Sequence, residues 1–136
     1  MARFSLNRPV KQETFTATPN GQDPMTFVLD VIGPDNMIDY IAFNSTNDYK
    51  AMLKHKLALA TGRIVGWEGV VDEENNELKF SLENLYKLLE LREFLPYLFL
   101  VADHTIATIQ AEEAEEADKL KKGKPAKALP TVSKQS

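Results

Sequence analysis

The sequence predicts an α+β fold, in which an N-terminal antiparallel β-hairpin or meander is followed by three α-helices and a disordered C-terminal tail. Two observations predict it: β-favouring runs separated by turn residues fill the first ~45 positions, and helically spaced apolar residues follow. At 136 residues, the chain is long enough for one core. We expect a flexible N-terminus at 1–10, a single α+β domain at 11–121 whose C-terminal helix projects beyond about 110, and a disordered tail at 122–136.

Three segments near the N-terminus have the composition of strands. They are Thr14–Thr18, Met25–Ile32 and Met37–Phe43. The turn residues Pro19–Gly21 and Gly33–Asn36 separate them, so the sequence predicts two to three antiparallel strands.

Three later segments carry helical spacing. The first is expected at Asn47–Thr61, with Ser45 or Thr46 as N-cap and Gly62 as its end. The second is expected at Ser81–Leu91 and the third at Phe94–Lys121, with a structured, non-helical connection at Gly62–Phe80. The third segment is apolar all round up to Ala102 and charged from Gln110 onward, which predicts burial at one end and exposure at the other.

The composition argues against several classes of protein. With no cysteine, the chain has no disulfide, thiol nucleophile or thiolate zinc site, which favours a reducing compartment. A net charge of -4 argues against a nucleic-acid partner. The longest apolar run, Phe94–Ala102, is too short to span a bilayer, so no membrane partner is expected.

The residue types used in catalysis are few and poorly placed. His55 lies between two lysines, and His104 and Asp103 are adjacent on a helix, so they point in different directions. The acidic run Asp72–Glu77 lacks the order of a calcium loop and is expected to be a solvated hairpin turn. We therefore expect no enzyme, no catalytic residue, no metal site and no cofactor.

Four apolar or aromatic residues are candidates for binding another protein. They are Phe15 on the N-terminal edge strand, Trp67 between two glycines, and Tyr97 and Val101 on the third helix. The alternative for each is a place in the core, and for Trp67 that of a plug that seals the helices against the sheet. The sequence leaves both open.

The segment RIVGWEGVVDEENNELKFSLENLYKLL, residues 63–89, resembles a pattern found in the tail assembly chaperones of long-tailed, lambda-like bacteriophages (siphoviruses). The likeness is carried by fifteen positions: Gly66, Trp67, Glu68, Gly69, Val70, Asp72, Glu73, Asn76, Phe80, Ser81, Glu83, Asn84, Leu85, Leu88 and Leu89. The chain has Asn75-Asn76 where that pattern commonly has a glycine.

The resemblance implies a protein of the host cytoplasm that coats the tape measure protein, helps to recruit the major tail protein, and is absent from the mature virion. It also implies a longer form made by programmed ribosomal frameshifting. We further expect the protein to self-associate. Two other functions remain open: a structural minor tail or head–tail connector protein that stays in the particle, and a small regulatory adaptor.

Overall fold

The computed structural model describes residues 1–4 and 11–123, with side chains up to residue 120. Most of the expected flexible N-terminus at 1–10 lies outside the described residues, and so does the expected disordered tail from residue 124 onward. The chain divides into two compact units, Met1–Asp103 and His104–Ser136, the second of which is described up to Gly123.

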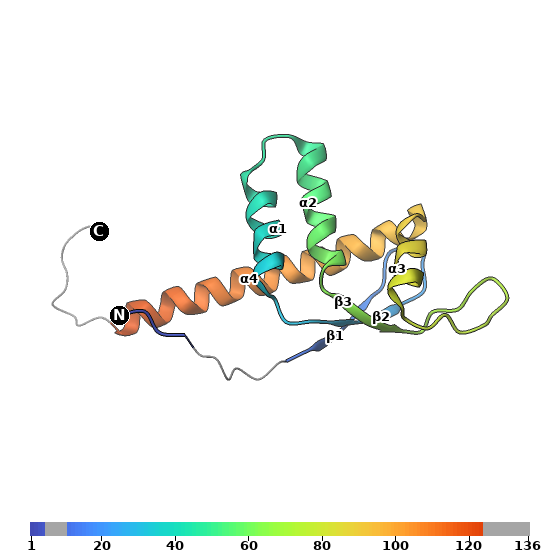
Figure 1. The fold of residues 1–136 in the computed structure, drawn as a ribbon, viewed down its shortest axis with the longest axis horizontal. Coiled ribbons are helices and arrows are strands. Elements are labelled where there is room, and N and C mark those ends of the chain that lie inside the picture. The colour runs from blue at the N-terminus through green and yellow to red at the C-terminus, as the bar shows by residue number, and fades with distance from the viewer. Residues whose placement is uncertain (5–10, 124–136) are drawn as a thin grey trace. The chain divides into compact units, whose positions relative to one another are not determined.

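The described residues form a three-stranded antiparallel sheet, four α-helices and one short 3-10 helix (Figure 1). The elements are β1 (Glu13–Ala17), β2 (Met25–Leu29), α1 (Pro34–Ser45), α2 (Tyr49–Thr61), β3 (Ile64–Glu68), α3 (Leu82–Leu89), the 3-10 helix η1 (Arg92–Phe94) and α4 (Leu95–Gly123). This confirms the predicted α+β class and its N-terminal antiparallel hairpin. Strands β1 and β2 and helices α2, α3 and α4 begin within two residues of their predicted positions.

The prediction of a strand at Met37–Phe43 was wrong, because this segment lies within α1. The preceding Gly33–Asn36 is a helix start rather than a hairpin turn. Pro34 occupies the first turn, where its missing N–H has no partner to lose, and the Asn36 side chain accepts a hydrogen bond from the Gly33 N–H at 2.8 Å. A short apolar run does not by itself distinguish strand from helix.

The third strand comes from the segment expected to be a connection. Within Gly62–Phe80, residues Ile64–Glu68 form β3, which pairs antiparallel with β2. The sheet order is β1-β2-β3, so β2 is the central strand. Its alternating side chains Met25, Phe27 and Leu29 are all buried on one face.

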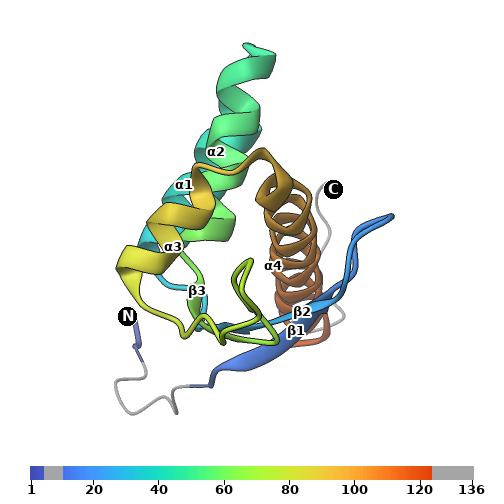
Figure 2. The same cartoon turned by 90° about the vertical axis from the view of Figure 1, so that its right-hand side faces the viewer.

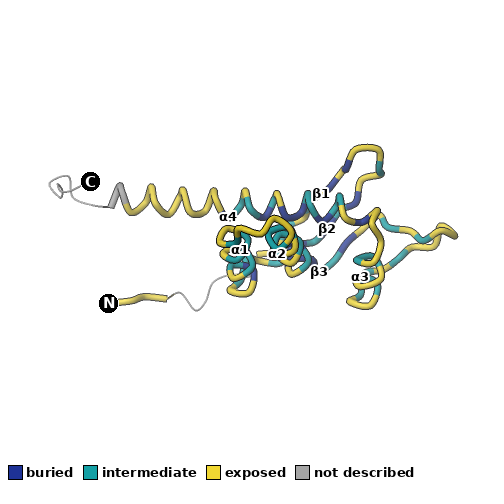
Figure 3. Tube along the Cα trace, turned by 90° about the horizontal axis from the view of Figure 1, so that it is seen from above, coloured by how far each residue is buried: buried dark blue, intermediate teal, exposed yellow. Residues whose placement is uncertain are grey.

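These strand residues belong to the core of the first unit, which also takes residues from α2, α3, η1 and the start of α4. The cluster is Ala17, Met25, Phe27, Leu29, Ala60, Ile64, Trp67, Leu85, Phe94, Leu98, Val101 and Ala102. In the second unit, residues 110–120 of α4 are all exposed (Figure 3).

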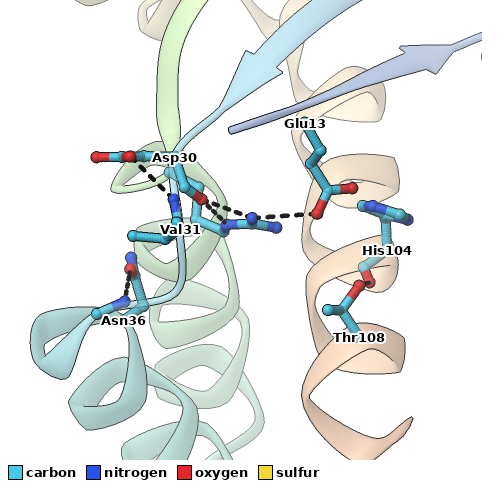
Figure 4. Close-up of polar contacts among 8 residues, drawn as sticks. Glu13, Asp30, Val31, Asn36, His104 and Thr108 are labelled. Atoms are coloured by element: carbon cyan, nitrogen blue, oxygen red, sulfur yellow. Dashed lines mark hydrogen bonds and ion pairs between the residues drawn. The ribbon is translucent and has the colours of Figure 1, made fainter. Parts of the chain in front are cut away.

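Helices α1 and α2 form an antiparallel hairpin (Figures 1 and 2). In the sequence this hairpin is inserted between β2 and β3, which are neighbours in the sheet. The two ends of this insertion meet at Asp30 and Arg63. The Asp30 N–H donates to the Arg63 carbonyl at 2.8 Å. In return, the Arg63 side chain donates to the Asp30 carbonyl from Nε at 2.9 Å and from Nη2 at 2.6 Å. Nη2 also forms an ion pair with Glu13 of β1 at 3.4 Å, so one side chain joins three segments (Figure 4).

Replacing Arg63 should destabilise the fold, since its side chain is only 2% exposed and the Asp30 carbonyl would lose two charged donors. We expect Arg63→Met to lower the free energy of unfolding by about 1.5 to 3 kcal/mol, measured by urea denaturation. Glu13→Gln should cost less than about 1 kcal/mol, because the Glu13 side chain is 38% exposed and its contact is long. An Arg63→Met protein as stable as the wild type would contradict this role.

The acidic run after β3 is a hairpin turn, as predicted. Val71 and Glu77 form a bridge, and the Asp72 carboxylate accepts hydrogen bonds from the N–H groups of Glu74 and Asn76, both at 2.9 Å. Asn75 has a φ of 64°, in the left-handed region that favours glycine and tolerates asparagine. Asn75 therefore adopts the backbone conformation for which the tail assembly chaperone pattern commonly has a glycine.

A β-branched residue at position 75 should strain this turn. We expect Asn75→Val to lower the free energy of unfolding by about 1 to 2 kcal/mol, while Asn75→Gly stays within about 0.5 kcal/mol of the wild type. Thermal or urea unfolding of the two variants measures the difference. Equal stability of the valine and glycine variants would show that the turn has another conformation.

Candidate protein-binding surface

The Gly-Trp-Glu-Gly motif at residues 66–69 is explained by the path of the chain through β3. Gly66 lies opposite Val28 of β2, and a Cβ atom at Gly66 would come within 3.2 Å of the Val28 Cβ. Gly69 has a φ of 81°, which allows the chain to turn out of the strand. The motif is thus a signature of this fold.

Trp67 fills the place of a core plug. It is 7% exposed, its indole N–H donates to the Leu78 carbonyl at 2.8 Å, and its ring meets Phe80 edge-on with centroids 4.9 Å apart. Val101 is fully buried in the same core. Phe15 packs against this core but is partly exposed. Among these three predicted binding residues, Phe15 alone offers accessible surface.

Tyr97, the fourth predicted residue, is partly buried on the first turn of α4. Its hydroxyl donates a hydrogen bond to the carbonyl of Asp23, in the connection between β1 and β2. Burial raises the pKa of the Tyr97 phenol, and the nearby Asp23 carboxylate raises it further, so the phenol stays a neutral donor at physiological pH.

Two exposed apolar pairs lie on helices of the first unit, and the prediction from sequence missed both. The α1 pair is Ile38 and Ile41, 63% and 58% exposed, and the α3 pair is Leu82 and Tyr86, 60% and 59% exposed. The spacings of three and four residues place each pair on one helix face. Reading 37–43 as a strand hid the first pair, because the helical spacing of Ile38 and Ile41 was not considered.

An open cleft of about 240 Å³ lies near the α3 pair in sequence, although neither member lines it. Its apolar lining includes Val71, Leu91 and Tyr97. The acidic residues Asp23 and Glu93 also line the cleft, and both are exposed. The volume is below the ~300 to 1,000 Å³ of common small-molecule pockets.

Among the described residues, no group of three His, Cys, Asp or Glu side chains is placed to hold a metal ion. His55 is partly buried on α2 and His104 lies on α4, where Thr108 donates to its backbone carbonyl (Figure 4). Nor does any helix within the described ranges have the length and apolar character needed to cross a membrane.

Removing the Tyr97 hydroxyl should cost about 0.5 to 1.5 kcal/mol of stability at neutral pH, since the Asp23 carbonyl loses its donor. Because the pKa of Tyr97 is raised by folding, its contribution is complete below about pH 10 and is lost as the pH rises through the folded-state pKa. Urea denaturation at pH 8 and above pH 10 should show that the free energy of unfolding falls less between the two pH values in Tyr97→Phe than in the wild type. Tyr49→Phe, at a 69% exposed position, is the control and should behave as the wild type.

Comparison with known proteins gives one finding. The family model described as YdaY prophage protein matches residues 40–123, from the second half of α1 to the end of α4. Neither the curated proteins nor the solved structures gave a match. Because the matched segment exceeds half of the chain, this protein belongs to the YdaY prophage protein family and is of phage origin.

Proposed function

We propose that this protein is a tail assembly chaperone without catalytic activity. It binds the tape measure protein in the host cytoplasm, helps to recruit the major tail protein and leaves before the virion is complete. Self-association and a longer form made by programmed frameshifting are parts of the same proposal. The phage origin of the family and the resemblance of residues 63–89 support this choice.

The observation that carries the proposal is the pair of apolar faces on α1 and α3. Ile38, Ile41, Leu82 and Tyr86 are each well over half exposed, although the domain has a full core in which to bury apolar side chains. Single exposed apolar residues are common on protein surfaces, but pairs on one helix face form the centre of many helix-mediated contacts.

Such small faces suit a reversible shield. Each buries too little area for tight binding, so many copies along an elongated partner provide the total strength through multivalency. Each copy still dissociates when a tail tube subunit competes for the same stretch. A chaperone that must be displaced needs this combination of many contacts and modest affinity per contact.

Charging the α1 pair should weaken capture of the tape measure protein. We expect Ile38→Glu/Ile41→Glu to reduce co-purification of the co-expressed tape measure protein by about tenfold or more, which is ~1.4 kcal/mol. Stability should change by less than about 0.5 kcal/mol per site, because both side chains are exposed. Asn44→Glu/Asn47→Glu is the matched control, since it adds two charges at exposed polar positions and should bind normally.

The function is tested in the phage itself. Deleting the gene should abolish tails of normal length, and mass spectrometry of purified particles should detect no copies of this protein. Its presence at fixed stoichiometry in virions would replace the proposal with a structural role. Normal tails in the deletion strain would exclude both.

A further inference from the structure

The cleft described above has the size and lining of a socket for one apolar side chain. Among its lining residues, Val71 and Leu91 are 56% and 47% exposed, whereas Phe94 is buried and Tyr97 is partly buried. Placing a leucine here removes apolar surface of both partners from water, worth roughly 25 cal/mol per Å² before the costs of association.

The edge of the cleft is acidic. Asp23 and Glu93 line it, and within the described part of the chain neither carboxylate forms an ion pair. The surrounding segment has the same sign, since residues 68–93 contain eight acidic and three basic side chains. An occupant with basic residues next to its apolar anchor therefore complements this surface.

The chain carries one segment of that chemistry. Residues 119–130 contain five lysines, no acidic residue, and the two leucines Leu120 and Leu129. Leu120 is 61% exposed, and lysines at 119, 121 and 122 surround it in the sequence. The acidic residues at 112–118 reduce the field of this segment at a distance, but ion pairs formed in direct contact are screened much less.

We propose that the lysine-rich segment 119–130 of one copy docks into the cleft of a second copy, with a leucine in the socket and lysines against Asp23 and Glu93. This contact specifies the self-association included in the proposed function. It joins two different surfaces, so it is heterologous and leaves a free cleft at one end of each pair and a free segment at the other. Such a contact repeats, and copies of the chain line up along an elongated partner.

Sedimentation velocity of the full chain over a range of concentrations tests the contact. The average sedimentation coefficient of the wild type should rise with its concentration, and 0.5 M salt should weaken this association. The cleft variant Asp23→Lys/Glu93→Lys and the segment variant Lys119→Glu/Lys121→Glu/Lys122→Glu should each associate at least about tenfold more weakly. Glu73→Lys/Glu74→Lys makes the same charge change at exposed turn residues outside the cleft and should associate as the wild type or more weakly by under twofold.

Mixing the two deficient variants separates a head-to-tail contact from other arrangements. The intact segment of the cleft variant and the intact cleft of the segment variant should associate, and the two charge-reversed surfaces also complement each other, so the mixture should associate at least about tenfold more strongly than either variant alone. A mixture that stays monomeric, variants that associate like the wild type, or a monomeric wild type would overturn the proposal. Unfolding midpoints equal to that of the control show that the variants are folded.

The outcome is independent of the tape measure experiment. A monomeric protein that still captures the tape measure protein overturns this contact and leaves the proposed function standing. A protein that forms head-to-tail assemblies but captures no tail component leaves the contact standing and removes the chaperone role.

Discussion

The fold depends on the contact between Asp30 and Arg63, which brings the chain back to the sheet after the α1–α2 hairpin. Strands β2 and β3 are neighbours, yet the α1–α2 hairpin lies between them in sequence, so a long segment must be closed at its base against an entropic cost that grows with its length. Asp30 and Arg63 close it by exchanging hydrogen bonds in both directions. Arginine suits this position because its planar guanidinium donates along two directions at once while its charge reaches Glu13 of β1. A lysine keeps the charge but not the paired donors.

The helices that were predicted correctly are those whose ends are marked by capping or terminating residues in the sequence. Helix α3 begins where Ser81 caps it, with the Ser81 hydroxyl accepting from the Asn84 N–H at 3.0 Å, and α2 ends at Gly62. The two errors come from signals that depend on tertiary context. A Gly-Pro-Asp-Asn sequence fits both a hairpin turn and a helix start, and the outcome was decided by the segment that follows. Strand β3 has only five residues and contains Gly66, so its local strand signal is weak and it depends on pairing with β2.

The binding residues were harder to predict than the fold, for a physical reason. Aromatic and branched side chains fill cores and interfaces alike, so composition does not separate Val101, which is fully buried, from Ile38, which is mostly exposed. Periodicity separates them only when the correct period is assigned. Once 34–45 is recognised as a helix, Ile38 and Ile41 share a face that Tyr40 does not, and Tyr40 is buried. The Gly-Trp-Glu-Gly motif, the clearest pattern in the sequence, reports on backbone geometry and core filling, and so gives evidence of ancestry rather than of a contact surface.

The surfaces assigned to different partners use different residues. The cleft is lined by the β1–β2 connection, the chain around the acidic turn, the end of α3 and the start of α4, whereas Ile38 and Ile41 of the α1 pair are not among its residues. Docking of a second copy therefore leaves the α1 pair free to bind another protein. Each added copy then raises the local concentration of α1 pairs, and a partner held by several of them dissociates only when all release together. Association between copies in this way provides avidity for an elongated partner, while each single contact remains weak enough to be displaced.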